Sequence, residues 1–372
     1  MLWTPEQDNA LKAVDRWLKK GESQVFRLFG YAGAGKTTLA RHFATNADGD
    51  VAFAAFTGKA AHVMRQKGCE GATTIHSLIY RPARDDEAEE GELMFTIRRD
   101  APASKADLII IDECSMVDEE LGRDLLSFGK PVLVLGDPAQ LPPVKGGGYF
   151  TEAEPDFMLT EIHRQAQGNP IIRLSMQIRE GRPQTGSDDF GGDHSCRIIR
   201  KDEITSEDIL SADQVLVGTN RTRKRFNDRI RELKGHSDPY PEAMEKLVCL
   251  RNNKSKGLLN GGIWTVVLRK APRGEKARMV VAPEDGVSNS GKSVSISVPK
   301  AMFTEGPESV PWTTRKNSDE FDFGYALTVH KSQGSQWDNV VLFDESYAFR
   351  EQSARWLYTG VTRAAEKLTL VR

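Results

Sequence analysis

A glycine-rich segment near the N-terminus has the spacing of a phosphate-binding loop. Residues 30–37 read GYAGAGKT, which fits the pattern GxxxxGK[ST], between a strand-like run and a helix-like stretch. Glycine permits a tight loop whose N–H groups point at phosphate oxygens, and the following helix adds its positive end. An ordinary glycine-rich turn is the alternative, and this context disfavours it. We expect these residues to hold a nucleoside triphosphate: Gly30, Tyr31, Gly33, Ala34, Gly35, Lys36, Thr37 and Thr38.

Two further groups that could act on a phosphate follow apolar runs. Asp112 and Glu113 end the run at 108–111, and Gln140 follows the run at 132–135. We expect Thr37 and Asp112 to bind Mg²⁺, and Glu113 to orient or deprotonate a water, which means hydrolysis rather than transfer to a substrate. Gln140 is a candidate sensor of the γ-phosphate. A solvated turn is the alternative for the acidic pair.

The elements that must position these groups read as an α/β fold. Near-continuous apolar runs separated by helix-like stretches predict a parallel sheet covered on both faces, with ligands at the carboxyl ends of its strands. The runs are 25–29, 51–56, 108–111 and 132–135. A helix is predicted from Pro5 to about Lys20, with Thr4 as its N-cap.

The rest of the chain predicts a second α/β unit with an insert. Strand-like runs at 215–217 and 340–343 flank residues 251–321, which are rich in Gly, Ser, Pro and Lys and contain strand-like pieces. That composition predicts a small β module. The pieces lie at 263–268, 279–282 and 294–298. Residues 78–104, which contain an acidic run, predict a small hairpin-like excursion from the first unit.

Composition narrows the class of protein. The 372 residues carry 51 basic and 53 acidic side chains, a net charge of −2, so any binding of nucleic acid must come from local patches. The four cysteines, at 69, 114, 196 and 249, are scattered, which argues against a disulfide scaffold and a zinc site and for a reducing compartment. No apolar run approaches the roughly 18 residues of a membrane span, and no signal peptide is evident. We expect a cytoplasmic location, in a bacterial cytosol or a phage-infected cell.

Eight segments, in order along the chain, carry a resemblance to a known family. The chain resembles superfamily 1 DNA helicases of the B type, with RecD-like and Dda-like members. The segments similar to the family's motifs are 30–37, 56–61, 73–78, 112–117, 136–144, 159–165, 325–335 and 358–364.

The resemblance implies two RecA-like domains with ATP between them. Arg164 and Arg363 would then be arginine fingers on the γ-phosphate, and Gln333 and Gly334 would bind nucleotide; surface salt bridges are the alternative for the arginines. The implied domains are 1A (1–77 and 105–150), a 1B pin (78–104), 2A (151–250 and 322–372) and an SH3-like 2B insert (251–321).

Gln7 has two interpretations. The family's Q motif reads adenine, and an amide can pair with its N6 and N7 edge. The alternative is a capping box with Thr4. We favour adenine, and both can hold at different times.

The resemblance also implies a track for single-stranded DNA, built from residues that donate hydrogen bonds to the DNA backbone. Thr57 could instead cap a helix, and His76 and His330 could be packed core histidines. The dense basic run at 220–225 predicts a helix start that faces DNA, with a solvated helix face as the alternative. The residues expected in the track are Thr57, Gly58, Lys59, Thr74, His76, Asn220, Arg221, Thr328, His330, Lys331 and Ser332.

These expectations combine into an ATP- and Mg²⁺-dependent DNA helicase. It would move 5′ to 3′ on single strands, act at single-strand/duplex junctions and work as a monomer; the direction comes from the resemblance alone. The main alternative is an ATP-switched translocase that displaces proteins without unwinding, and a small-molecule kinase is disfavoured by the second set of motifs. Gln336 stands where many relatives have an acid on the ribose, and its neutral amide can still hydrogen-bond a hydroxyl.

Overall fold

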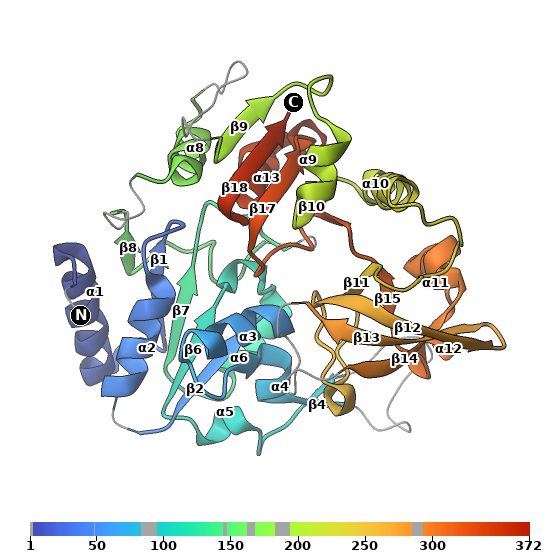
Figure 1. Cartoon of the computed structure of the whole chain (residues 1–372). Coiled ribbons are helices and arrows are strands. Elements are labelled where there is room, and N and C mark those ends of the chain that lie inside the picture. The colour runs from blue at the N-terminus through green and yellow to red at the C-terminus, as the bar shows by residue number, and fades with distance from the viewer. Residues whose placement is uncertain are drawn as a thin grey trace. The chain divides into compact units, whose positions relative to one another are not determined.

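The computed structural model describes residues 3–47, 49–82, 95–143, 147–161, 168–182, 194–284 and 293–372 (Figure 1). The chain forms two compact units. Unit 1 comprises Met1–Phe56, Ala60–Gln184 and Glu351–Thr362, and unit 2 comprises Thr57–Lys59, Thr185–Arg350 and Arg363–Arg372. The described residues within 151–182, and residues 351–362, which the family resemblance assigns to the second RecA-like domain, therefore cluster with unit 1.

Unit 1 contains a parallel six-stranded sheet in the order β3-β2-β6-β7-β1-β8. Its strands are β1 (Val25–Gly30), β2 (Val51–Ala55), β3 (Thr73–Thr74), β6 (Leu108–Asp112), β7 (Val132–Gly136) and β8 (Phe157–Leu159). Every residue of β6 and β7 is buried, as expected for central strands covered on both faces. The predicted parallel sheet is confirmed.

Alternate residues of the central strands lie in two separate apolar cores. Leu108 and Ile110 face a core that includes residues of α1, α2 and α3, whereas Ile109 and Ile111 face one that includes residues of α4 and α6. The helices assigned to unit 1 are α1 (Pro5–Lys20), α2 (Lys36–Asn46), α3 (Gly58–Gln66), α4 (Ile75–Ile79), α5 (Pro102–Lys105), α6 (Glu119–Leu126), α8 (Pro170–Arg179) and α13 (Ser353–Val361). The first two residues of α3, Gly58 and Lys59, are an exception because they cluster with unit 2. A short 3-10 helix, η1 (Cys114–Met116), follows β6.

A short antiparallel ribbon leaves unit 1 where the excursion was predicted. It pairs β4 (Tyr80–Pro82) with β5 (Phe95–Ile97), and residues 83–94 lie outside the described residues.

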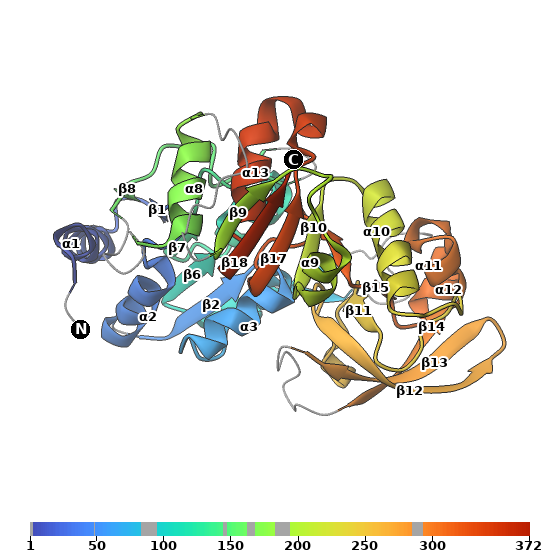
Figure 2. The same ribbon diagram turned by 45° about the horizontal axis from the view of Figure 1, so that its top comes forward.

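Unit 2 contains a second parallel sheet, in the order β16-β10-β17-β18-β9 (Figure 2). Its strands are β9 (Cys196–Ile199), β10 (Gln214–Val217), β16 (Ala326–Thr328), β17 (Trp337–Phe343) and β18 (Ala364–Val371). The helices beside it are α9 (Ser206–Ser211) and α10 (Asn220–Leu233), and the 3-10 helix η4 spans Ser346–Gln352. The predicted strands at 215–217 and 340–343 lie in β10 and β17.

An antiparallel sheet completes unit 2, in the order β14-β13-β12-β11-β15. Its strands are β11 (Lys246–Cys249), β12 (Ile263–Arg273), β13 (Lys276–Pro283), β14 (Val294–Pro299) and β15 (Phe321–Phe323). The strand-like pieces predicted within 251–321 lie in β12, β13 and β14, and the sheet also recruits β11 and β15 from outside that range. Short helices accompany it: η2 (Lys254–Lys256), α11 (Ala301–Thr304), η3 (Pro307–Ser309) and α12 (Trp312–Lys316).

Two global expectations can be compared with the structure. All four cysteines are buried free thiols. Among the described helices, none is both long enough and apolar enough to cross a membrane.

Candidate nucleotide and nucleic-acid sites

The glycine-rich loop joins β1 to α2, as predicted. Gly33 and Gly35 have φ values of 83° and 82°, a conformation that side chains with a Cβ rarely adopt, and Gly35 is the N-cap of α2. A Cβ added at Gly30 would lie 2.8 Å from Cβ of Leu159. Steric constraints therefore require glycine at these three positions of the loop.

The cationic and metal-binding candidates converge on this loop. Lys36 Nζ donates to the carbonyls of Gly30 (2.6 Å) and Tyr31 (3.2 Å). Thr37 Oγ1 donates to Asp112 Oδ2 at 3.0 Å, although the two residues come from α2 and the end of β6. A hydroxyl beside a carboxylate is the oxygen donor set that Mg²⁺ takes in phosphate sites. The residues therefore fit the expected metal.

Glu113 has a left-handed backbone, with φ 54° and ψ 45°, and its N–H donates to Asp112 Oδ1 at 2.8 Å. A non-glycine residue in this conformation costs on the order of 1–3 kcal/mol, and such strain concentrates at functional sites. The Glu113 side chain is half-buried.

Two buried polar atoms near these strand ends have no hydrogen-bond partner within the described residues. They are Oε1 of Gln140, whose residue is 7% exposed, and Oγ of Ser115, whose residue is 2% exposed. An unsatisfied buried acceptor costs roughly 1–3 kcal/mol. Gln140 Oε1 would be satisfied by a donor such as a bound water, which fits its predicted place beside the γ-phosphate.

A hydroxyl network that the sequence analysis missed ties α13 to two of these loops. Oη of Tyr358 accepts from the N–H of Ala32 at 3.1 Å and donates to Oδ2 of Asp137 at 2.7 Å. Tyr358 is 2% exposed, and burial, followed by the negative charge of Asp137, raises its pKa, so it stays a neutral donor. One residue on, Thr359 Oγ1 accepts from the N–H of Leu141 at 3.0 Å.

Gln7 makes the alternative contacts that the sequence left open, and one more. Its N–H donates to Thr4 Oγ1 (3.2 Å) and its Oε1 accepts from the N–H of Thr4 (3.1 Å), which is the capping box. Its Nε2 also donates to the carbonyl of Ala34 in the phosphate loop at 3.3 Å. The buried amide is thus held against the loop, and adenine recognition stays a prediction.

Tyr31 is covered by a cation that the sequence analysis did not single out. The guanidinium carbon of Arg179, at the end of α8, lies 3.5 Å from the centroid of the Tyr31 ring, a cation–π arrangement.

Of the two arginine-finger candidates, only Arg363 is among the described residues. Arg164 lies outside the described residues. Arg363 is 5% exposed and its Nη1 donates to the carbonyl of Ser335 at 3.2 Å, next to Gln333 and Gly334 of the same segment. The roles of these four nucleotide-site candidates remain predictions.

The DNA-track candidates of unit 1 lie on α4. Thr74 caps the helix by accepting from the N–H of Ser77 at 3.2 Å. The His76 ring lies 6.1 Å from the Phe56 ring and 5.6 Å from the Tyr80 ring. Burial lowers the pKa of His76, and the charge of Asp118 opposes that shift. His76 is therefore a neutral, aromatic-packed side chain at neutral pH.

The segment at 57–59 clusters with unit 2. A Cβ at Gly58 would lie 3.0 Å from Leu259 Cδ2, and Lys59 Nζ lies 5.0 Å from the Trp337 ring centroid. Lys59 is only 4% exposed. Its predicted contact with a DNA phosphate would require Lys59 to be reached within this packed environment, whereas Thr57 is half-buried.

The remaining candidates lie at strand and helix ends of unit 2. Thr328 and Ser332 are buried, with Thr328 Oγ1 accepting from the N–H of Lys331 at 3.3 Å. His330 packs 5.3 Å from the Phe349 ring, and burial lowers its pKa. Asn220 and Arg221 open α10, whose N-cap is Thr219, so the predicted helix start is confirmed.

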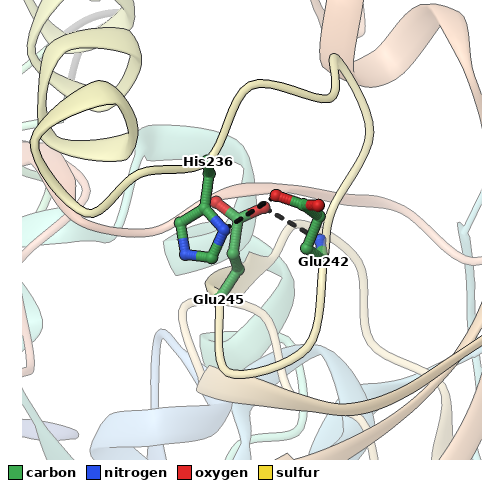
Figure 3. Close-up of side chains that lie close together, drawn as sticks. All are labelled: His236, Glu242 and Glu245. Atoms are coloured by element: carbon green, nitrogen blue, oxygen red, sulfur yellow. Dashed lines mark hydrogen bonds and ion pairs between the residues drawn. The ribbon is translucent and has the colours of Figure 1, made fainter.

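A further cluster of possible metal ligands in unit 2 is already satisfied by its neighbours (Figure 3). His236 Nδ1 lies 2.8 Å from Glu242 Oε2, and Glu242 N–H donates to Glu245 Oε2 at 2.9 Å. Glu245 is fully buried, and Arg231 donates to both of its oxygens, at 2.6 and 3.0 Å. A guanidinium thus already supplies the positive charge that a cation would bring.

Comparisons with known proteins give the family. The profile of a family described as "AAA domain" matches residues 3–195, more than half of the chain, and that of a "UvrD-like helicase C-terminal domain" matches residues 323–371. The chain belongs to this AAA domain family and is a superfamily 1B helicase of the RecD-like type.

Relatives and solved structures agree with this membership. The chain is 28% identical to an "ATP-dependent RecD2 DNA helicase" of Deinococcus radiodurans, over 99% of this chain and 52% of the relative. It is 25% identical to the "RecBCD enzyme subunit RecD" of Mycolicibacterium smegmatis, over 92% of this chain and 67% of the relative. The chain spans about half the length of the first of these relatives.

Two solved structures share the fold. One is described as DNA unwinding at forked duplex DNA by two coordinating Pif1 helicases, with a TM-score of 0.61, 19% identity, and coverage of 100% of this chain and 92% of that one. The other, Bacteroides Pif1 bound to single-stranded DNA, has a TM-score of 0.57, 19% identity and the same coverage. The fold is that of the RecA-like helicases.

The buried Tyr358 hydroxyl predicts a stability effect. Tyr358→Phe should lower the free energy of unfolding by roughly 1–3 kcal/mol, because it leaves two buried polar partners unpaired. Urea unfolding measures it. Tyr347→Phe is the matched control: Tyr347 is 73% exposed, so this variant should leave the free energy of unfolding unchanged. An equal effect of the two variants would contradict the network.

The two packed histidines predict a pH effect. Because burial lowers the folded-state pKa of His76 and His330, the unfolded chain binds more protons below the ordinary value of 6.5. Their contribution to stability is complete above pH 6.5 and is lost as pH falls through the folded-state pKa. The double variant His76→Gln/His330→Gln should therefore lose less stability than the parent between pH 7 and pH 5 in urea titrations. His194→Gln, at an exposed position, should follow the parent.

Proposed function

We propose that the protein is an ATP- and Mg²⁺-dependent DNA helicase that translocates 5′ to 3′ on single-stranded DNA and unwinds duplex at single-strand/duplex junctions. The observation that carries the ATPase part is the 3.0 Å contact between Thr37 and Asp112, which joins the phosphate loop to the acidic strand end. Family membership supports the coupling to DNA, and the 5′-to-3′ direction rests on the B-type resemblance.

In this proposal the loop and its neighbours divide the chemistry of hydrolysis. Lys36 neutralises the β- and γ-phosphates, while Thr37 and Asp112 hold Mg²⁺, which supplies charge neutralisation at the phosphoryl group when bound. Glu113 takes a proton from the attacking water, and Gln140 senses the γ-phosphate. Arg164 and Arg363 complete the set as donors to the developing charge.

The proposed DNA-binding residues contact the DNA backbone and not the bases. Thr57, Gly58, Lys59, Thr74 and His76 would serve one part of the track. Asn220, Arg221, Thr328, His330, Lys331 and Ser332 would serve the other. The β4–β5 ribbon is the proposed 1B pin, and the antiparallel sheet is the proposed 2B insert.

Loss of the loop lysine tests the ATPase. Lys36→Ala should reduce DNA-stimulated ATP hydrolysis by on the order of 10²-fold or more, because a positive charge on the transferring phosphoryl group is lost. Circular dichroism and thermal unfolding should match the parent. Lys67→Ala, at an exposed position of unit 1, serves as the control. Robust turnover by Lys36→Ala would refute the site.

The polarity is tested with tailed duplexes. Unwinding of a duplex with a 5′ single-stranded tail, but not of one with a 3′ tail, is the expected result. ATPase stimulated by single strands without unwinding of either substrate would instead favour the translocase that displaces proteins. No stimulation by DNA would remove both assignments.

A further inference from the structure

One face of the antiparallel sheet in unit 2 collects positive charge. Paired residues of antiparallel strands point to the same face, and Lys270 of β12 pairs with Arg278 of β13, which pairs with Ser297 of β14. In the next row Arg273 pairs with Lys276. We call Lys270, Arg273, Lys276 and Arg278 the hairpin cations.

Charge balance separates these residues from other cations of the sheet. Residues 269–278 hold five basic side chains and one acidic, in a chain with a net charge of −2. Arg269, on the opposite face, is paired with Asp238 at 2.7 Å. In the described part of the chain no carboxylate lies within ion-pair distance of any hairpin cation; Lys270 Nζ donates to Ser295 Oγ at 2.8 Å and Lys276 Nζ to the carbonyl of Asn317 at 2.7 Å.

The same face is hollowed beside the hairpin. A groove of about 650 Å³ is lined by three of the hairpin cations, Arg273, Lys276 and Arg278, by one carboxylate, Glu275, and by Ser309, Pro311 and Thr314 among others. Arg273 and Arg278 are exposed at its edge and keep their five N–H donors each for a ligand. Cations and hydroxyls together form the donor set that contacts a nucleic-acid backbone.

The types of side chain on this face favour duplex DNA over single-stranded DNA as the ligand. Sites for single strands combine cations with aromatic rings on which bases stack. The paired rows from Leu268 to Pro299 on this face contain apolar aliphatic, hydroxyl and basic side chains and no aromatic ring. A duplex, whose bases are already stacked inside, offers phosphates alone to such a surface.

We propose that the hairpin cations bind the phosphate backbone of duplex DNA, without reading its sequence, as a contact additional to the single-strand track. The inference rests on the proposed function for its choice of DNA as the partner. A duplex bound to this sheet would stay bound to unit 2 while single-stranded DNA is bound by the residues of the proposed single-strand track.

The test compares two charge-reversal variants in binding assays without nucleotide. In Arg273→Glu/Arg278→Glu, affinity for a duplex closed by hairpins at both ends should fall about tenfold or more, and the slope of log K against log salt should become less steep by about 2, since each phosphate contact contributes about 0.9. Affinity for oligo-dT should be unchanged. Fluorescence anisotropy at several salt concentrations measures both.

Lys201→Glu/Lys367→Glu is the matched control, because it makes the same change in net charge at exposed positions on the parallel sheet of unit 2. An equal loss in this control, or an equal loss for oligo-dT, would overturn the proposal, as would unchanged duplex binding in Arg273→Glu/Arg278→Glu. ATPase stimulated by oligo-dT is measured in parallel: if it is absent in the parent, the proposed function fails, whereas a normal value with unchanged duplex binding refutes the hairpin cations alone.

Discussion

The contact between the Thr37 hydroxyl and the Asp112 carboxylate depends on the order of strands in the first sheet. The phosphate loop follows β1 and Asp112 ends β6, and these strands are separated by β7. Because all three are parallel, their carboxyl ends share one edge, and the loop after β7 emerges between the other two. One sheet edge thereby assembles the proposed metal ligands, the strained Glu113 and Gln140 without long excursions of the backbone.

A second constraint acts through α13. Although this helix lies more than 200 residues after the phosphate loop, Tyr358 bridges that loop to Asp137, and Thr359 holds the next turn at Leu141. Both hydroxyls lie at helix positions one residue from each other and just before Arg363. A change in the loop that moved Ala32 would therefore be felt at the C-terminal end of α13 through hydrogen bonds rather than through apolar contact alone. The same helix packs against α8, whose Arg179 covers Tyr31, so two helices that follow the loop at different distances along the chain both contact it.

The sequence could predict whatever depends on local pattern. Apolar runs predicted the central strands because buried parallel strands carry few polar residues, and the glycine spacing predicted the loop because left-handed φ values at Gly33 and Gly35 exclude other residues. Contacts between distant residues were beyond such reasoning. Nothing in the spacing of Tyr358 or Arg179 signals a partner in the phosphate loop, and the sequence could not show that Lys59 is buried against Trp337. The recruitment of β11 and β15 into the antiparallel sheet was missed for the same reason, since pairing over 70 residues leaves no periodic signal.

The buried thiols have a practical consequence. Burial raises the pKa of Cys69 to about 11 and that of Cys249 to about 12, and it raises the pKa of Cys114 as well. Alkylating reagents attack the thiolate, so the sulfurs of Cys69, Cys114 and Cys249 are protected twice, by exclusion and by protonation, whereas that of Cys196 is protected by burial. Cys69 and Cys114 belong to unit 1, and Cys196 and Cys249 to unit 2. The native chain thus carries its own set of chemical reporters, two for each unit, and their rates of modification would record how often each unit opens, without any label being engineered into it.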